Sequence, residues 1–311
     1  MRIPCAAEPP PAWGIPQEHG EITGPGGQES GPPDWPGSCN IPIMMKKVLV
    51  PLDGSKLSES ILGPVMSLFK GSNGNVTLLH AVTPSEYFSV TAAQYVQQER
   101  RRSAAYLQTL AERIGSNGTG VQERIVTGEA SREIVEEARR GHVDLIAMSS
   151  HGRSGIREWA FGSVAERVLR TTNVPVLVFR GDVPRSYAIR KIVIALDGSE
   201  ESLEVVAPAS EIAAAVGAAV VLLHAGKHRP PAVQLAAQTL HRAGVSYTTR
   251  LLRGEPATAI LAAAEEEKAD VLALTTTGKT KRDQIFFGSV AEEVLKMSGR
   301  PLLVVHTGRV K

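Results

Sequence analysis

The sequence predicts an α/β protein that contains two tandem doubly wound domains, each a parallel sheet flanked by helices. Three observations support this fold class. Most of the chain is repeated once, strand-like and helix-like segments alternate within each copy, and only 5% of the residues are aromatic. Cores must then be built from Val, Leu, Ile and Ala, which suits strands buried on both faces, and the alternation is typical of parallel sheets.

Four collinear blocks form the repeat. They are KKVLVPLDGS (46–55) and RKIVIALDGS (190–199), VTLLHAV (76–82) and VVLLHAG (220–226), GEASREIVEEARRGHVDLIAMSSHG (128–152) and GEPATAILAAAEEEKADVLALTTTG (254–278), and FGSVAERVLRTTNVPVLVF (161–179) and FGSVAEEVLKMSGRPLLVV (287–305). The offset between the copies is 144 residues in the first two blocks and 126 in the last two, so copy two lacks 18 residues between its second and third strands. Four blocks in the same order indicate an internal duplication.

The elements of copy one follow from this pattern in chain order. We expect strands over 47–52, 75–81, 121–126, 144–149 and 175–180, and helices over 56–70, 90–115, 131–140 and 162–172. Pro175 opens the last strand, where a missing N–H is tolerated. The alternation implies right-handed crossovers with helices on both faces of the sheet.

The domain boundaries are set by changes in composition. Residues 1–45 are expected to be a disordered Pro/Gly-rich tail, because they cannot bury enough apolar surface to offset their ordering entropy. The first domain then covers 46–180, a linker 181–189 and the second domain 190–307. One hypothesis is that Met44 or Met45 is the true initiator. A peptide from the tail in mass spectrometry of the native protein would contradict it.

Composition narrows the function classes. A net charge of +2 gives no basic surplus for nucleic acid or an anionic membrane. The longest apolar run, Ile212–Leu223, is interrupted by Gly217 and is too short to span a bilayer, and no secretory signal is visible. Both cysteines, Cys5 and Cys39, lie in the tail, so the folded part needs no disulfide or thiolate metal site. We therefore expect a cytoplasmic protein whose partners include neither nucleic acid nor membrane.

Two motifs fall at the carboxyl ends of predicted strands, where open α/β sheets bind ligands. The first is LDGS, which places Asp53 in copy one and Asp197 in copy two after the first strand. The second is SSHG, starting at Ser149, or TTTG, starting at Thr275, each followed after nine residues by GSV.

The second motif favours an anion. Glycines let backbone N–H groups approach an oxyanion closely, and Gly162, Ser163 and Val164 open a helix whose N–H groups and dipole attract phosphate. Asp53, at a neighbouring strand end, is suited to accept a hydrogen bond from a ribose hydroxyl or an adenine amino group. Together the motifs predict a nucleotide lying across strands one and four.

These residues resemble the universal stress protein A family, whose signature is G-x2-G-x9-G-[ST]. VPLDGS, the LLH strand and the closing VPVLV strand match as well, and the resemblance covers 46–180 and 190–307. It implies five-stranded sheets in the order 3-2-1-4-5, and ATP binding in one subfamily but not in another. Exposed apolar edge strands invite pairing. We therefore expect the two halves to pair within the chain as a pseudo-dimer, with other faces left for a possible homodimer.

The resemblance also implies contacts for individual residues. In copy one, adenine and ribose would be surrounded by Pro51, Asp53 and Ala81, and the phosphates held by Gly152, Gly162, Ser163 and Val164, beside His151 and Arg153. The first signature glycine is replaced by Ser149. The copy-two positions are Ala195, Asp197, Ala225, Thr275, Gly278, Lys279, Gly288, Ser289 and Val290. Because copy two departs further from the family pattern, we rank the first site above the second.

Structural interpretations stay open for the same residues. DGS is also a plain turn and helix-cap sequence, and GSV is also a plain helix start. His80 and His224 fit packed or hydrogen-bonded structural positions better than catalytic ones. The basic residues of the nine-residue loops fit a phosphate or a solvated loop equally well. GKT at 278–280 is not a Walker loop, because the required first glycine falls at Ala273.

The functional hypotheses follow from these motifs. No Ser/His/Asp constellation, metal-ligand cluster or catalytic carboxylate pair recurs at the strand ends, so we expect no enzyme beyond slow ATP hydrolysis. The leading hypothesis is a stress or signalling protein that binds ATP, with or without Mg²⁺, as a regulatory ligand. The alternative is a nucleotide-free universal stress protein acting as a protein–protein interaction scaffold. An α-hydrolase-like enzyme is a weaker third hypothesis, because its HIGH-type and SGGxDS-type loops are absent.

Overall fold

A computed structural model describes residues 45–69, 73–83, 90–115, 119–150, 162–184, 186–276 and 287–307. The expectations for the tail, apart from Met45, lie outside these residues. The strands of the first half are β1 (Lys47–Pro51), β2 (Asn75–Val82), β3 (Gly120–Thr127), β4 (Leu145–Ser149) and β5 (Val176–Phe179). Its helices are α1 (Lys56–Ser60), α2 (Leu62–Ser67), α3 (Val90–Ile114), α4 (Ala130–Gly141) and α5 (Ser163–Thr171).

The second half repeats this plan with a shorter helix after its second strand. Its strands are β6 (Lys191–Leu196), β7 (Ala219–Ala225), β8 (Tyr247–Leu252), β9 (Val271–Thr275) and β10 (Leu302–Val305). Its helices are the 3-10 helix η2 (Glu201–Val205), α6 (Val206–Val216), α7 (Pro231–Arg242), α8 (Pro256–Glu266) and α9 (Ser289–Met297).

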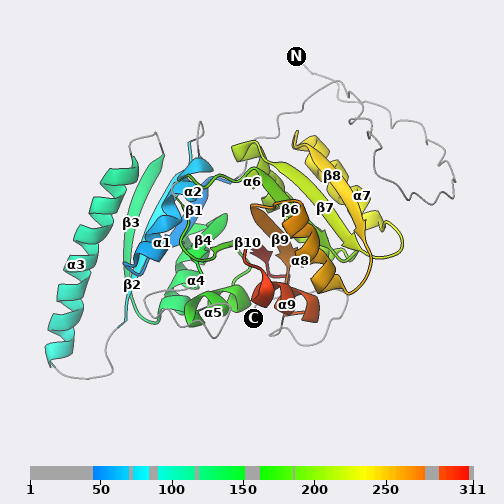
Figure 1. Cartoon of the computed structure of the whole chain (residues 1–311). Helices are drawn as coiled ribbons and strands as arrows, with labels where there is room; N and C mark the ends of the chain where they lie inside the picture. The colour runs from blue at the N-terminus through cyan, green and yellow to red at the C-terminus, as the bar shows by residue number, and fades with distance from the viewer. Residues whose placement is uncertain are drawn as a thin grey trace, which may run out of the picture. The chain divides into compact units, whose positions relative to one another are not determined.

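All ten strands form one sheet in the order β3-β2-β1-β4-β5-β10-β9-β6-β7-β8. Within each half the strands are parallel, and the predicted order 3-2-1-4-5 is confirmed in both. Figure 1 shows β3 with α3 towards one end of this sheet and β8 with α7 towards the other. The two outer edges of the sheet are therefore β3 and β8.

Successive side chains of each strand pack alternately into two apolar layers. On β1, Val48 and Val50 pack into the layer shared with α2, α3, α6 and α7, whereas Leu49 packs into the layer shared with α4, α5, α8 and α9. All three side chains are at most 1% exposed. This period of two, with both faces covered, accounts for the nearly continuous apolar runs of the strand sequences.

The predicted helix over 56–70 is two short helices instead. Helix α1 ends at Ser60, and α2 begins at Leu62. Pro64 has no N–H to donate to the carbonyl of Ser60, which removes one helical hydrogen bond at the break. At this break the Ser60 hydroxyl donates to Leu57 O at 2.8 Å and accepts from Val183 N at 3.2 Å.

The two halves meet where β5 runs antiparallel to β10, with Leu177 opposite Leu303. The predicted pairing of the last strands within one chain is confirmed by this register. The Arg180 guanidinium crosses the junction and donates to the carbonyls of Leu295 and Lys296 at the end of α9, where the helix dipole favours a cation. Burial lowers the pKa of Arg180. Because the junction is antiparallel, the carboxyl ends of the two half-sheets lie at opposite ends of the strands.

Candidate functional site

A cavity of about 500 Å³ lies at the carboxyl ends of β1, β2 and β4, beside the start of α5. This is the point where strand order reverses in the first half, because β1 pairs with β2 on one side and β4 on the other. The cavity is lined by Pro51, Leu52, Asp53, Ser58, Leu79, His80, Ala81, Val82, Thr83, Tyr95, Glu99, Ala130, Ile134, Met148, Ser149, Ser150, Gly162, Ser163, Val164 and Ala165.

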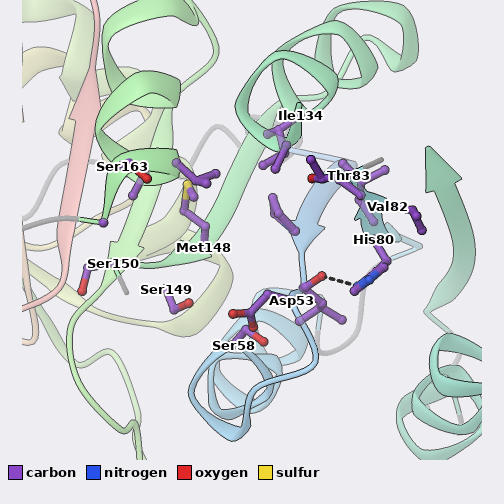
Figure 2. Close-up of a pocket in the computed structure, with 18 of the residues that line it drawn as sticks. Asp53, Ser58, His80, Val82, Thr83, Ile134, Met148, Ser149, Ser150 and Ser163 are labelled. Atoms are coloured by element: carbon purple, nitrogen blue, oxygen red, sulfur yellow. Dashed lines mark hydrogen bonds between the residues drawn. The ribbon is translucent and has the colours of Figure 1, made fainter. Parts of the chain in front are cut away.

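The structure brings together the predicted residues of copy one that it describes. All seven line this cavity: Pro51, Asp53, Ala81, Ser149, Gly162, Ser163 and Val164. Figure 2 shows Asp53 and His80 on one side of the cavity and Ser163 on the other. The predicted contacts of His151, Gly152, Arg153, Gly278 and Lys279 lie outside the described residues.

Asp53 also has a structural role in the turn after β1. Its Oδ1 accepts from the amide of Ser55 at 3.0 Å and from its hydroxyl at 2.6 Å. Ser55 in turn caps α1 by accepting from the amide of Ser58. The same turn recurs in the second half, where Asp197 accepts from the amide and hydroxyl of Ser199. The turn-and-cap interpretation of DGS is therefore correct for both copies, and it leaves Asp53 in the cavity wall.

His80 is held by the backbone at the same strand end. Its Nδ1 lies 2.8 Å from the carbonyl oxygen of Leu52, which assigns the ring proton to Nδ1 in the neutral imidazole (Figure 2). Its ring packs edge-on against Tyr106 of α3, with centroids 6.2 Å apart. Burial, together with the nearby Glu59 carboxylate, raises the pKa of the Tyr106 hydroxyl. His224 repeats the bond to the carbonyl of Leu196 at 2.9 Å, so the structural interpretation holds for both histidines.

The helices beside the cavity begin in two different ways. At α4, the Glu129 carboxylate accepts from the amides of Ser131 and Arg132, and Glu255 does the same at α8. At α5, the cap position is Gly162, which has no side chain to satisfy the first-turn amides. Its own N–H donates to the carbonyl of Ser150 at 2.6 Å. First-turn amides have no partner inside a helix, and a helix start without a side-chain cap is able to bind an anion.

Charge is distributed unevenly among the described residues that line the cavity. Asp53 and Glu99 are its acidic side chains, and no Lys or Arg occurs among the lining residues that the structure describes. The source of positive electrostatic potential in this lining is the N-terminal end of the α5 helix dipole. The cavity therefore offers hydrogen-bond acceptors near β1 and α3 and an anion-binding start at α5.

Several lining residues were missed by the sequence analysis. Ser58 and Ala130 lie in the first turns of α1 and α4, Thr83 follows β2, and Met148 precedes the predicted Ser149 at the end of β4. Tyr95 and Glu99 on α3 are different, because no motif marks them. The 18 residues by which copy one exceeds copy two were the one available signal, since they fall in this segment.

The residues at the corresponding strand ends of the second half are more deeply buried than those of the first half. Ala195, His224 and Thr275 are 8%, 6% and 9% exposed, whereas Pro51, His80 and Ser149 are only partly buried. The remaining described positions, Ala225, Gly288, Ser289 and Val290, keep the same places after β7 and at the start of α9.

The segment after β7 accounts for this greater burial. Gly198 has a φ of +86°, and a Cβ there would lie 3.0 Å from the Pro230 ring. A Cβ on Gly226 would lie 2.5 Å from Nε2 of His224. The chain therefore passes directly over the turn and the histidine before α7 begins.

Metal binding and membrane insertion find no support in the described part of the chain. There, His, Cys, Asp and Glu side chains form no group of three or more that is arranged to hold a metal ion. The described helices also include none with the length and apolar character needed to cross a bilayer.

Comparisons with known proteins identify the family. The model of the universal stress protein family matches residues 44–180, 188–240 and 229–306. Universal stress protein YxiE of Bacillus subtilis is 29% identical over 44% of this chain and 100% of its own length. Universal stress protein MJ0531 of Methanocaldococcus jannaschii is 34% identical over 44% of this chain and 83% of its own length.

A solved structure shares the arrangement of both halves. The crystal structure of a universal stress protein from Archaeoglobus fulgidus covers 85% of this chain and 100% of its own, with a TM-score of 0.70 at 22% identity. This likeness concerns the fold alone. Together with the family match along both halves, it shows that the chain is a tandem member of the universal stress protein family.

Proposed function

We propose that this chain binds an adenine nucleotide, ATP in the first instance, in the cavity of its first half and uses it as a regulatory ligand. The observation that carries the proposal is the convergence of seven predicted residues, spread from Pro51 to Val164, on one cavity of about 500 Å³. Cavities of about 300–1,000 Å³ are usual for small-molecule ligands.

The polarity of the cavity sets the direction of the ligand. Carboxylates accept hydrogen bonds from hydroxyl and amino groups but repel phosphate, so the end with Asp53 takes the nucleoside. The amides that open α5, together with the Ser163 hydroxyl, take the phosphates. Pro51 and Ala81 provide apolar wall for the base. Mg²⁺ would accompany the phosphates rather than occupy a site of its own.

The proposed ligand acts by differential affinity. It touches the ends of three strands and the helices α3, α4 and α5, so it stabilises the arrangement in which these elements enclose the cavity. A ligand at 100 times its Kd stabilises the state it binds by about 2.7 kcal/mol. Such a shift is enough to change which partner surface the protein presents, without any chemical step.

The test is direct. The full chain is purified, denatured, and the released small molecules are identified and quantified against protein. We expect ATP or ADP at a near-stoichiometric ratio, and an increase in the thermal unfolding temperature on adding Mg-ATP.

A matched pair of variants locates the site. Asn at position 53 can still accept from Ser55 but loses its charge, and hydrogen bonds to charged acceptors are stronger than those to neutral ones. Asp53→Asn should weaken ATP binding about tenfold, in line with a loss of about 1.4 kcal/mol. Asp197→Asn makes the same change in the same turn of the second half and should leave the affinity unchanged. Equal effects of the two variants would contradict a site in the first half.

The scaffold hypothesis keeps one specific observation in its favour. Asp53 and the N–H of Gly162 already have hydrogen-bond partners within the fold, so neither of them needs a ligand. If the purified chain carries no nucleotide and Mg-ATP produces no thermal shift, this hypothesis replaces the first.

A further inference from the structure

Most of the 18 residues that copy two lacks correspond to the shortening of one helix. Helix α3 of the first half has 25 residues, whereas α7 of the second half has 12. Only the longer helix contributes to a described cavity, through Tyr95 and Glu99. In the second half Pro230, directly before α7, instead lies beside Gly198 in the turn after β6. The extra length of α3 is therefore built into the wall of the cavity.

Tyr95 has an unusual position for an aromatic side chain. It is 47% exposed, and among the described residues the other exposed large apolar side chains are Leu235, Leu251 and Met297, none of which lines the cavity. Leaving such a ring in water costs free energy that a bound apolar surface would recover. An exposed ring on the wall of a cavity is therefore a candidate contact for a ligand.

The surroundings of Tyr95 specify the kind of ligand surface. Glu99 lies one turn further along the same face of α3 and also lines the cavity, where its carboxylate pairs with Arg102 at 2.7 Å and is a hydrogen-bond acceptor. At the end of β2 the cavity wall includes the apolar side chains of Ala81 and Val82, flanked by His80 and Thr83. A flat, uncharged ring system that carries hydrogen-bond donors matches these neighbours. Aromatic side chains stack on such rings.

We infer that Tyr95 stacks on the base of the bound nucleotide, and that the extension of α3 is the base-binding wall of the first half. This inference rests on the proposed nucleotide binding. Loss of stacking on an aromatic side chain corresponds to a decrease in affinity of roughly tenfold or more. The second half has no counterpart of this wall among its described residues.

The experiment compares three substitutions of Tyr95 in the full chain, using ATP as the probe and isothermal titration calorimetry as the readout. Tyr95→Ala and Tyr95→Leu should each weaken ATP binding about tenfold, whereas Tyr95→Phe, which keeps the ring, should bind like the unaltered chain. Gln98→Ala is the matched control, because Gln98 is an exposed residue on the next turn of α3 that does not line the cavity. The unfolding temperature of each variant without ligand should not change.

Two results would overturn the inference while the proposed function stands. In one, Tyr95→Ala binds ATP as tightly as the unaltered chain. In the other, Tyr95→Leu keeps full affinity, which would make the side chain an apolar filler rather than a stacking ring. Failure of the unaltered chain to bind ATP would remove the proposed function, and the inference with it.

Discussion

The guanidinium of Arg170 on α5 lies over the ring of Phe287, with Cζ 4.4 Å from the ring centroid. The two residues belong to different halves, so this cation–π contact spans the junction formed by β5 and β10. Arg170 also pairs with Glu166 one turn earlier, at 2.9 Å, and its side chain is 25% exposed. Partial burial makes such a contact stronger than one in open water.

Arg170→Ala should therefore lower the free energy of unfolding by about 1 kcal/mol, measured by urea denaturation. Lys296 is the control, because it occupies the equivalent position on α9 and pairs with Glu292 one turn earlier. An exposed pair of this kind contributes only about 0.3–0.5 kcal/mol. If Lys296→Ala costs as much as Arg170→Ala, the contact with Phe287 adds nothing measurable.

The junction itself should make the two halves unfold together. Leu303 on β10 is fully buried opposite Leu177, and a buried Leu→Ala substitution costs about 2–5 kcal/mol. We expect Leu303→Ala to lower stability by this amount in a single urea transition that retains its slope. Leu251→Ala, at a leucine that is 42% exposed on β8, should change stability by less than about 0.5 kcal/mol. Two separated transitions in the unaltered chain would show that the junction does not couple the halves.

The Glu129 carboxylate contributes to the stability of the fold in a pH-dependent way. The hydroxyl of Ser131 and the amides of Ser131 and Arg132 hold the pKa of this carboxyl below its usual range. The stabilisation is therefore fully present above the ordinary carboxyl pKa and is lost as the pH falls through the lowered value.

Glu129→Ala should cost about 0.5–1 kcal/mol at pH 7, a cap-sized effect reduced by solvent screening. The difference from the unaltered chain should shrink below about pH 4 and disappear at lower pH. Urea denaturation across this range provides the check. Glu136→Ala, which removes a carboxylate of α4 that does not cap the helix, is the control. A cost that stays constant with pH would exclude capping by the ionised carboxylate.

The path of the chain over His224 should tolerate no side chain at position 226. Nδ1 of His224 is fixed by the Leu196 carbonyl, so the ring cannot turn away from a Cβ that would lie 2.5 Å from Nε2. Gly226→Ala should lower stability by about 1–3 kcal/mol in thermal or urea unfolding. Gly299→Ala meets no atom within 4 Å and serves as the control.

Nucleotide stoichiometry tests the difference between the halves. Because Pro230 lies beside the turn after β6 and the strand-end residues of the second half are more buried than those of the first, we expect calorimetric titration with ATP to give one nucleotide per chain. Two nucleotides per chain would mean that the segment containing Pro230 moves aside. In that case Asp197→Asn would weaken one of the two binding events.

The alternation within the repeat was sufficient to predict the elements of the first half, whereas the order of both half-sheets was predicted from the family resemblance. The predicted strands and most helices end within one residue of the observed ones, because alternating apolar runs and glycine turns mark them directly. The break between α1 and α2 was missed, although Pro64, which removes the helical hydrogen bond to Ser60 O, is visible in the sequence.

The candidate site could be predicted only where a motif marks it. Asp53, Ser149 and Ser163 adjoin strand ends or a helix start that the repeat shows twice. Tyr95 comes from a helix that meets the cavity through tertiary packing, so no local pattern reveals it. The greater burial of the second site depends in the same way on where Pro230 lies in space. The domain boundaries and the roles of the site residues stay predictions.

The antiparallel contact between β5 and β10 is made within one polypeptide, so dilution cannot separate its two sides. An association of separate single-domain chains would be lost at low concentration, and both partners would carry the same sequence. Here each half always has its neighbour present at a fixed ratio of one to one. The second half can therefore accumulate substitutions that abolish ligand binding and still complete the sheet of the first half. Covalent linkage in this way permits one copy to specialise as a permanent structural partner of the other.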